Sequence, residues 1–544
     1  MKVKDGKWSI SSRDLFRGSK CEHCIRVSMV VAAGVDEAIE HLRPYLEDLS
    51  TKLPIIQGNQ REQMVFDQIE ASLPEGDFLL LDDFSESSTL AAMEQGVPVI
   101  GQAFMARNLS GIQWSGVADL LVRDGYDITQ TESNEIVATP TPGENGGGYR
   151  ALDVKNSGSM SDSYVVQLGS YQAALQELGH LGSGNPAIIF GFGKGIEEVD
   201  SMQSIEVFWQ AVSETRPLLD ETDPLECTLD LVVTWSCSQP KVCKEVYCEY
   251  PKLCKELFEA TGDISLLHQK SYHHINWLRD SGYETVSDLA LSADRPSLAK
   301  GDEDLANYYF HAAKAMQMEK DGKRTIAGLI QGKVDLPPRT QGDLFFDIEW
   351  FNPVDSVDPL FFMLGVMDSD EKFFDFTSAA ETEERERFEG FVTYAMERLG
   401  AYPEMHIYHV NSPEVTKLRD MSKKHGGYLK DEVELLVSRM VDLQKIAKAT
   451  FVPGSGSYSI KSLERYYPDR DRLRGNSDVS AGDDAMYKFH LFLEASADGR
   501  GSEATQIMDS IREYNKDDCL STKLLYEWMA TMEFIEPWEL HHPQ

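Results

Sequence analysis

In the second half of the chain, two acidic residues interrupt an otherwise apolar run. Asp347 and Glu349 stand two positions apart within residues 344–350, and side chains at that spacing share one face of a strand. Carboxylates in apolar surroundings are costly unless a cation or hydrogen bonds compensate for them. Mg²⁺ and Mn²⁺ prefer carboxylate oxygen, so the pair is a candidate divalent-metal site.

A complementary pair of residues occurs near the end of the chain. Tyr514 and Asp518 stand four positions apart, which places them on one face of the last expected helix. A phenol beside a metal-binding carboxylate could position the water that attacks a substrate. The pair thus complements the acids of the apolar run as a candidate part of one site.

The first half of the chain contains a second set of charged residues in apolar runs. Asp119 lies within residues 116–121, and Asp153 and Lys155 lie within residues 151–155. Alternation along a strand places Asp153 and Lys155 on one face. An acid pair can hold a metal while the adjacent ammonium polarises water or balances the charge of a scissile phosphate. The alternative is an ordinary salt bridge within the strand.

Two helical segments add polar residues to this set. Residues 58–62 are expected to open a helix that carries the acid Glu62, and Gln167 and Tyr171 stand at helical spacing.

Six of the eight cysteines form two groups. One group is Cys21 and Cys24, and the other is Cys237, Cys243, Cys248 and Cys254. In a cytosolic chain, clustered thiols indicate a metal or iron–sulfur site rather than disulfides. A zinc ion bound by these thiolates is one alternative to an iron–sulfur cluster, and plain core cysteines that bind no metal are the other. Cys227 and Cys519 are expected in the core.

The elements that must position these residues follow an α/β pattern. Strand-like runs at residues 78–81, 97–100, 151–154 and 187–190 alternate with helical stretches, and residues 123–149 are expected to form a long hairpin loop. Residues 264–330 are helical in pattern, with a turn like that of a helix-hairpin-helix unit, for which a small packing domain is the alternative. We therefore expect an α/β multidomain protein divided into residues 1–260, 261–335 and 336–544.

Composition narrows the function classes. The chain has 544 residues, of which 42% are hydrophobic and 26% charged, as in globular proteins of several domains. No apolar run approaches the roughly 18 residues of a membrane helix, so we expect a cytoplasmic protein without membrane contact. The net charge of −38 opposes non-specific attraction to phosphate backbones and excludes a passive nucleic-acid coat. A nucleic-acid enzyme with a local basic strip is not excluded, and one basic cluster, for which a solvated helix face is the alternative, comprises Lys461, Arg465, Arg470, Arg472 and Arg474.

Residues 342–528 resemble the DEDD-type 3′–5′ exonucleases of the ribonuclease-H-like superfamily, in the variant whose last motif is Y-x-x-x-D. The resemblance implies that Asp347 and Glu349 fill the first motif, that Asp518 is the metal-binding acid of the last, and that Tyr514 orients water. Two metals about 3.5–4 Å apart would then stabilise the attacking and leaving oxygens. An inactivated scaffold of the same fold is the alternative.

The second motif departs from that pattern. Where the superfamily usually has an aspartate, this chain offers Glu414, directly after Pro413, which is expected to bend the segment. Asp442 is the reserve candidate for this metal ligand.

Residues 10–260 resemble the PD-(D/E)XK nuclease fold of RecB-family and CRISPR-associated RecB-like nucleases. The resemblance implies a restriction-endonuclease-like core with metal ligands Asp119 and Asp153, catalytic lysine Lys155, helical acid Glu62, and a substrate-positioning Q-x-x-x-Y element at Gln167 and Tyr171. Several such nucleases hold a [4Fe–4S] cluster with one early and three late cysteines, which implies Cys21, Cys243, Cys248 and Cys254 here, with Cys24 and Cys237 as alternatives.

The order of the two halves resembles a family of bacterial RecB-like nucleases with an appended ribonuclease-H-like domain. This implies an Mg²⁺- or Mn²⁺-dependent nuclease that acts on DNA, on ends or single strands, with a second RecB-like site. RNA as substrate and a catalytically degenerate nucleic-acid-binding or scaffold subunit of a repair or defence complex are the alternatives. No G-x-x-x-x-G-K-[ST] motif occurs, so a helicase partner would be another chain.

Overall fold

The chain forms two compact units in the structure, which is a computed structural model. The N-terminal unit comprises Met1–Leu257 with Val354–Val357, and the C-terminal unit comprises Phe258–Pro353 with Asp358–Gln544. The division predicted from the sequence, with residues 261–335 as a separate segment, stays a prediction. The structure describes residues 1–46, 52–141, 146–228, 248, 250–267, 272–292, 303–320, 325–354, 356–411, 413–473, 482–536 and 539–540.

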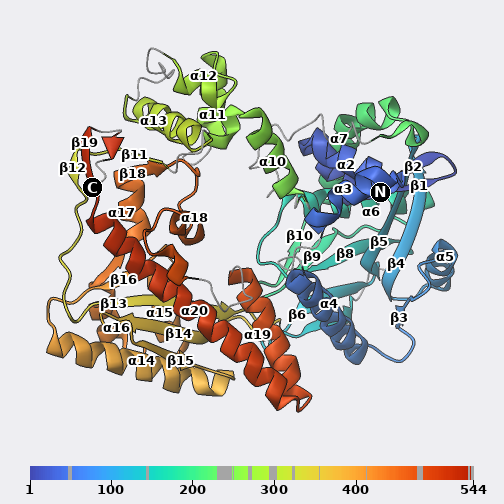
Figure 1. The fold of residues 1–544 in the computed structure, drawn as a ribbon. Coiled ribbons are helices and arrows are strands. Elements are labelled where there is room, and N and C mark those ends of the chain that lie inside the picture. Colours follow the sequence, from blue (N-terminus) through green and yellow to red (C-terminus); the bar gives the residue numbers. More distant parts are fainter. Residues whose placement is uncertain are drawn as a thin grey trace. The chain divides into compact units, whose positions relative to one another are not determined.

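A mixed sheet forms the centre of the N-terminal unit (Figure 1). Among the described residues it has eight strands, and the strands predicted near residues 78, 97, 151 and 187 are all present. The long strands β4 and β5 pair antiparallel, and β8 continues the sheet beside β5. The strands are β1 (Lys2–Lys4), β2 (Lys7–Ile10), β3 (Phe78–Leu80), β4 (Val99–Leu109), β5 (Ile112–Arg123), β8 (Tyr149–Lys155), β9 (Ala187–Phe190) and β10 (Ile196–Glu198).

Helices cover both faces of this sheet. Helix α4 packs Val65, Phe66 and Ile69 on one face, and α6 packs Leu168 on Ile188 and Phe190 of the other. Helix α6 in turn contacts α1 and α7. The helices are α1 (Ser12–Lys20), α2 (Glu22–Ala32), α3 (Asp36–Leu46), α4 (Lys52–Ser72), α5 (Glu86–Gln95), α6 (Asp162–Leu178), α7 (Ser201–Glu221) and α10 (Pro251–Thr261).

Two local predictions for this unit need comment. The expected start of a helix at residues 58–62 is wrong, because α4 already begins at Lys52 and Glu62 lies in its interior. Pro54 in the first turn is compatible with that start, since the first helical N–H groups lack intrahelical acceptors. The long hairpin loop predicted at residues 123–149 contains an antiparallel pair of strands, β6 (Tyr126–Gln130) and β7 (Ile136–Pro140).

The C-terminal unit begins with helices that join its sheet domain. Their core includes Leu278, Leu289 and Tyr309, together with Val452 from the sheet domain. A short strand, β11 (Ile326–Gly328), pairs with β18 (Phe451–Pro453). The helical elements are α11 (Tyr272–Asp280), α12 (Val286–Ala290) and α13 (Glu303–Lys320), with a 3-10 turn at Ile264–Leu267.

The sheet of the C-terminal unit has five strands among the described residues, in the order β15-β14-β13-β16-β17. β13 lies at its centre, antiparallel to β14 and parallel to β16. The strand predicted within residues 344–350 is confirmed. The strands are β13 (Leu344–Phe351), β14 (Leu360–Asp368), β15 (Phe373–Thr377), β16 (Ile407–His409) and β17 (Met440–Asp442).

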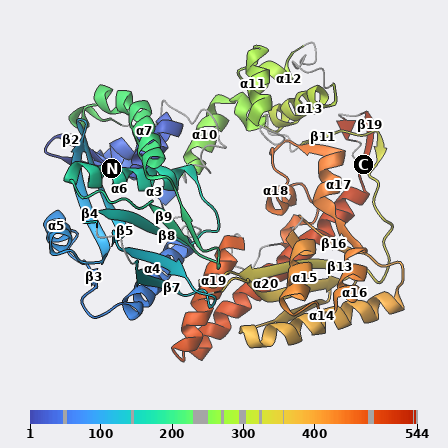
Figure 2. The same ribbon diagram turned by 180° about the vertical axis from the view of Figure 1, so that it is seen from behind.

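Helices lie on both faces of this sheet (Figures 1 and 2). Alternation along β13 directs its side chains into two cores, one on each face. Phe346 packs with α14, α15 and α16, whereas Phe345 packs with α17 and α20. Asp347 and Glu349 have the same parity as Phe345 and therefore face α20. These helices are α14 (Glu381–Ala401), α15 (Pro413–Lys424), α16 (Lys430–Val437), α17 (Leu443–Thr450), α18 (Ile460–Glu464), α19 (Gly482–Ala497) and α20 (Gly501–Ala530).

In the part of the chain that the structure describes, no helix is long and apolar enough to cross a membrane.

Candidate metal centre

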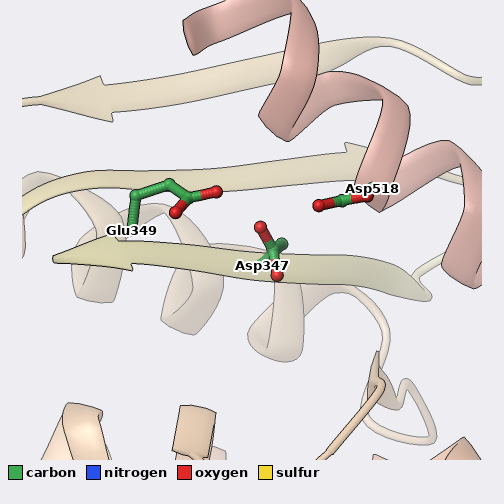
Figure 3. Close-up of side chains that lie close together, drawn as sticks. All are labelled: Asp347, Glu349 and Asp518. Carbon is green, nitrogen blue, oxygen red and sulfur yellow. The ribbon is translucent and has the colours of Figure 1, made fainter. Parts of the chain in front are cut away.

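Three carboxylates converge between β13 and α20. Asp347 and Glu349 project from the strand toward Asp518 on the helix (Figure 3), and one ligand oxygen from each lies within 4.8 Å of the others. Glu349 and Asp518 are buried, and Asp347 is half-buried. We call these three residues the acid triad. A search of the described residues for three or more His, Cys, Asp or Glu side chains close enough to share a metal ion finds the acid triad.

Burial and mutual repulsion act on the carboxylates of the acid triad. Burial, together with the Glu349 and Asp518 charges, holds the pKa of Asp347 well above its usual range. Burial and Asp518 also raise the pKa of Glu349 to about 8. Such a site is strongly unfavourable as three bare anions, and a divalent cation would relieve the repulsion. The donors are all carboxylate oxygens, which fits Mg²⁺ or Mn²⁺.

Asn515 is a part of this site that the sequence did not reveal. Its side chain is fully buried, Nδ2 donates to Asp347 Oδ2 at 2.7 Å, and a hydrogen bond from the same side chain lowers the pKa of Glu349. The helix can approach this closely because Gly365 of β14 lies against it. A Cβ at Gly365 would overlap Asn515 Oδ1.

Tyr514 lies beside Asp518, as their spacing predicted. Its hydroxyl hydrogen-bonds to the Asp518 carboxylate and accepts a hydrogen bond from Lys461 Nζ at 3.2 Å. The ammonium also lies 4.6 Å from the centre of the Tyr514 ring. Burial, reinforced by the neighbouring acids, raises the pKa of Tyr514, so its hydroxyl stays protonated at neutral pH.

The second-motif candidates, Glu414 and Asp442, have different surroundings. Pro413 begins α15, which places the buried Glu414 in its first helical turn. Glu414 Oε2 lies 3.2 Å from His409 Nδ1, and its charge contributes to the raised pKa values of Asp347 and Glu349. Asp442 instead caps α17, where its Oδ1 accepts from the backbone N–H of Lys445. Glu414 therefore lies electrostatically close to the acid triad, whereas Asp442 has a helix-capping position.

A cleft of about 550 Å³ opens at the acid triad. Asp347, Tyr514 and Asp518 line it, together with residues from α17 and the segment that leads into α18. The other lining residues are Val410, Asn411, Gln444, Lys448, Gly456, Ser457, Tyr458, Ser459, Ile460, Lys461 and Thr522.

This arrangement of sheet, helix and acids agrees with a comparison against family models. Residues 344–530 form an RNase_H superfamily domain. The acid triad, Tyr514 and the cleft all belong to this RNase H domain. Comparison with curated proteins and with solved structures gave no match.

The N-terminal unit also brings its predicted charged residues together. Asp153 is buried and forms an ion pair with Lys155, while Asp119 Oδ2 accepts from the Val154 backbone N–H at 2.7 Å. Burial, with repulsion from Asp153, holds the pKa of Asp119 well above its usual range. Burial would lower the pKa of Lys155, but Asp153 and Asp119 outweigh it and raise the pKa. The predicted salt bridge and the predicted metal ligands thus occupy one site.

Glu62 joins this group from the interior of α4. Burial and the charge of Asp153 raise its pKa, while Lys155 and a hydrogen bond from Gln102 lower it. Gln102 was not found from the sequence. It interrupts the pairing of β4 and β5 opposite Asp119, with a positive φ of 55°, and such strained backbones are frequent at functional sites.

Gln167 and Tyr171 of α6 connect to the same site. Gln167 Nε2 lies 3.3 Å from Asp153 Oδ1 and 2.9 Å from the Tyr171 hydroxyl, which donates to Val117 O at 2.5 Å. The roles that the sequence assigns to these residues stay predictions.

The predicted cysteine site is described in part, because Cys237 and Cys243 lie outside the described residues. Cys24, named as an alternative ligand, hydrogen-bonds with Cys248, an interaction that raises the pKa of the Cys24 thiol, and Cys21 lies nearby. The Sγ atom of Cys254 lies 3.2 Å from Nδ1 of the buried His23. Cysteines far apart in sequence thus gather. No iron–sulfur cluster is evident from the described residues, and the [4Fe–4S] cluster and the zinc alternative stay predictions.

Proposed function

We propose that this protein is a metal-dependent nuclease whose RNase H domain hydrolyses phosphodiester bonds of DNA from the 3′ ends of single strands. The observation that carries the proposal is the convergence of Asp347, Glu349 and Asp518 within a domain of that superfamily. Two buried carboxylates and one half-buried carboxylate this close together are unfavourable without a cation, and metal-assisted phosphodiester hydrolysis is a function that such a group supports.

The acid triad would hold Mg²⁺ or Mn²⁺, which supplies Lewis-acid activation of water and stabilises charge on the phosphate. Asn515 fixes the orientation of Asp347 through its amide hydrogen bond. The Tyr514 hydroxyl stays protonated, so it orients a water by hydrogen bonding and does not act as a base. Lys461 places a positive charge beside Tyr514 and lowers the pKa of Glu349.

Degradation of end-labelled DNA and RNA, each single- and double-stranded, tests this proposal. The full-length protein is expected to shorten single-stranded DNA from the 3′ end with Mg²⁺ or Mn²⁺, and to lose the activity in EDTA. Asp347→Ala should remove this activity. Preference for RNA would move the substrate to the alternative class, and binding without any cleavage would favour a degenerate scaffold.

A second nuclease site in the N-terminal unit is favoured by a separate observation. Asp119, Lys155 and Glu62 lie around the buried Asp153, and charges within this group shift the pKa values of those three residues. Paired acids with an adjacent lysine suit metal binding and charge balance at a phosphate. This arrangement supports the RecB-like assignment as a proposal, with a salt-bridged structural site as its alternative.

A further inference from the structure

Two lysines line the cleft beside the acid triad, and neither is among its metal-ligand candidates. Lys448 belongs to α17 and Lys461 to α18, and both border the cleft with residues 456–460. We propose that Lys448 and Lys461 bind the phosphodiester backbone of a single nucleic-acid strand and guide its end to the acid triad. This inference rests on the nuclease function proposed for the RNase H domain.

The positions of the two ammonium groups support the inference. Lys461 Nζ contacts the uncharged hydroxyl and ring of Tyr514, so an anion bound to it lies next to the acid triad. Lys448 is exposed and donates to the neutral amide oxygen of Gln444 at 2.5 Å. Its ammonium also lies 6.0 Å from the Tyr458 ring centre. At Lys448, a phosphate oxygen can replace the Gln444 amide oxygen at little cost, because it forms a stronger, charge-assisted hydrogen bond.

The charge of the whole chain makes these lysines more important. A net charge of −38 repels a polyanion, and the acid triad adds to that repulsion at the reaction site. Binding of a strand therefore requires cations at the cleft itself. Lys448 and Lys461 supply them on the elements that line it.

The size and lining of the cleft favour a single strand. Its volume of about 550 Å³ falls in the range of about 300–1,000 Å³ for sites that bury a small ligand, which suits the terminal nucleotide of a single strand. Ser457, Ser459 and Asn411 offer hydrogen-bonding groups to a sugar or base, and Val410 and Ile460 offer half-buried apolar surface.

Binding of labelled oligonucleotides to the full-length protein in EDTA tests the inference without any need for cleavage. The probes are a short oligothymidylate, a short oligouridylate and a matched DNA duplex, measured by fluorescence anisotropy over a range of salt. The variants are Lys448→Gln and Lys461→Gln, with Lys448→Arg as the charge-conserving rescue. Lys445→Gln is the matched control, because Lys445 is an exposed lysine of α17 that does not line the cleft.

Each Gln variant is expected to weaken single-strand binding by about tenfold and to reduce the slope of log Kd against log salt by about 0.7, the value for one phosphate contact on a single strand. Lys448→Arg and Lys445→Gln should bind as the wild type does, and duplex should bind more weakly than either single strand. The oligothymidylate and oligouridylate arms distinguish DNA from RNA as the source of the phosphates.

The outcomes separate this inference from the proposed function. Loss of binding in the Gln variants of a protein that cleaves nothing would support the lysine site and contradict the nuclease. Metal-dependent cleavage with unchanged affinity and salt slope in both variants would overturn the lysine site. It would also be overturned by a wild type that binds no single strand, or by affinity that falls only with Lys155→Gln in the N-terminal unit.

Discussion

The carboxylates of Asp347, Glu349 and Asp518 repel one another in the absence of a cation. One oxygen of each lies within 4.8 Å of one oxygen of the others, and burial removes water that would screen the charges. Asn515 and Lys461 offset part of this repulsion at Glu349. Three acids this close together destabilise the fold, and such a cost is common at catalytic sites. Their presence therefore favours a functional role over a structural one.

Asp347→Asn should therefore stabilise the metal-free protein while it removes activity. The neutral amide relieves the repulsion, so the melting temperature in EDTA should rise. The cleavage rate should fall about a thousandfold, because loss of a metal ligand removes several kcal/mol of transition-state stabilisation at about 1.4 kcal/mol per tenfold. Differential scanning fluorimetry and the cleavage assay measure the two effects.

The metal dependence of the melting temperature is the control for Asp347→Asn. Mn²⁺ at a hundredfold excess over its Kd should stabilise the wild type by about 2.7 kcal/mol and leave the variant unchanged. A wild type whose melting temperature is insensitive to Mg²⁺ and Mn²⁺ would contradict the assignment of the acid triad as a metal site.

Asn515→Ala should weaken metal binding although Asn515 is not itself a ligand candidate. Its amide holds the Asp347 carboxylate at 2.7 Å, and loss of such a partner typically costs about 10–100-fold in metal affinity or activity. Titration of Mn²⁺ by electron paramagnetic resonance gives the affinity directly. Lys516→Ala, at a half-exposed position next to it, is the control. Equal Mn²⁺ affinity in Asn515→Ala and the wild type would exclude this positioning role.

The sequence alone revealed those site residues that lie two or four positions apart along the chain. Asp347 with Glu349 and Tyr514 with Asp518 follow from the periods of a strand and a helix. Asn515 and Gln102 could not be found in this way. Their functional contacts cross 168 and 40 positions of sequence, and an asparagine or glutamine beside a motif carries no sign of its partner. The pairing of Glu414 with His409 likewise depends on where α15 begins relative to β16.

At the scale of elements, the helices before the RNase H domain support its cleft. The hydroxyls of Tyr308 and Tyr458 hydrogen-bond, and Tyr458 lines the cleft. Glu319 of α13 accepts from the Tyr466 hydroxyl at 2.6 Å. The composition of residues 335–339 suggests a linker. In the structure, β11 before this segment pairs with β18 after it. The two strands are more than a hundred positions apart, so the local composition could not reveal this contact.

A fragment of residues 336–544 is therefore expected to be less stable than one of residues 258–544. The shorter fragment loses β11, α13 and the buried surface around Val452. We expect a loss of at least about 2 kcal/mol, which corresponds to about 4–8 °C in melting temperature for a domain of this size. Thermal melts of both fragments by circular dichroism measure it. Coincident melts would show that the helical segment does not stabilise the RNase H domain.

At the scale of the whole molecule, two groups of buried acids occupy different compact units. Asp119 and Asp153 belong to the N-terminal unit, whereas the acid triad belongs to the C-terminal unit. The order of the two groups along the chain was predicted from sequence. The family comparison supports the second group through its domain and leaves the first as a proposal.

The two proposed sites predict two separable activities in the full-length protein. Lys155→Ala removes the ammonium that Asp153 and Asp119 hold in place, and Asp347→Ala removes one acid of the triad, so each variant should lose one set of cleavage products and keep the other. Each substitution acts within its own compact unit, so the effects on rate should be independent, as for sites that share no partners. Product lengths from 3′- and 5′-labelled substrates distinguish the two patterns, and the double variant should be inactive. Loss of all cleavage in either single variant would require one composite site or one inactive site in place of two.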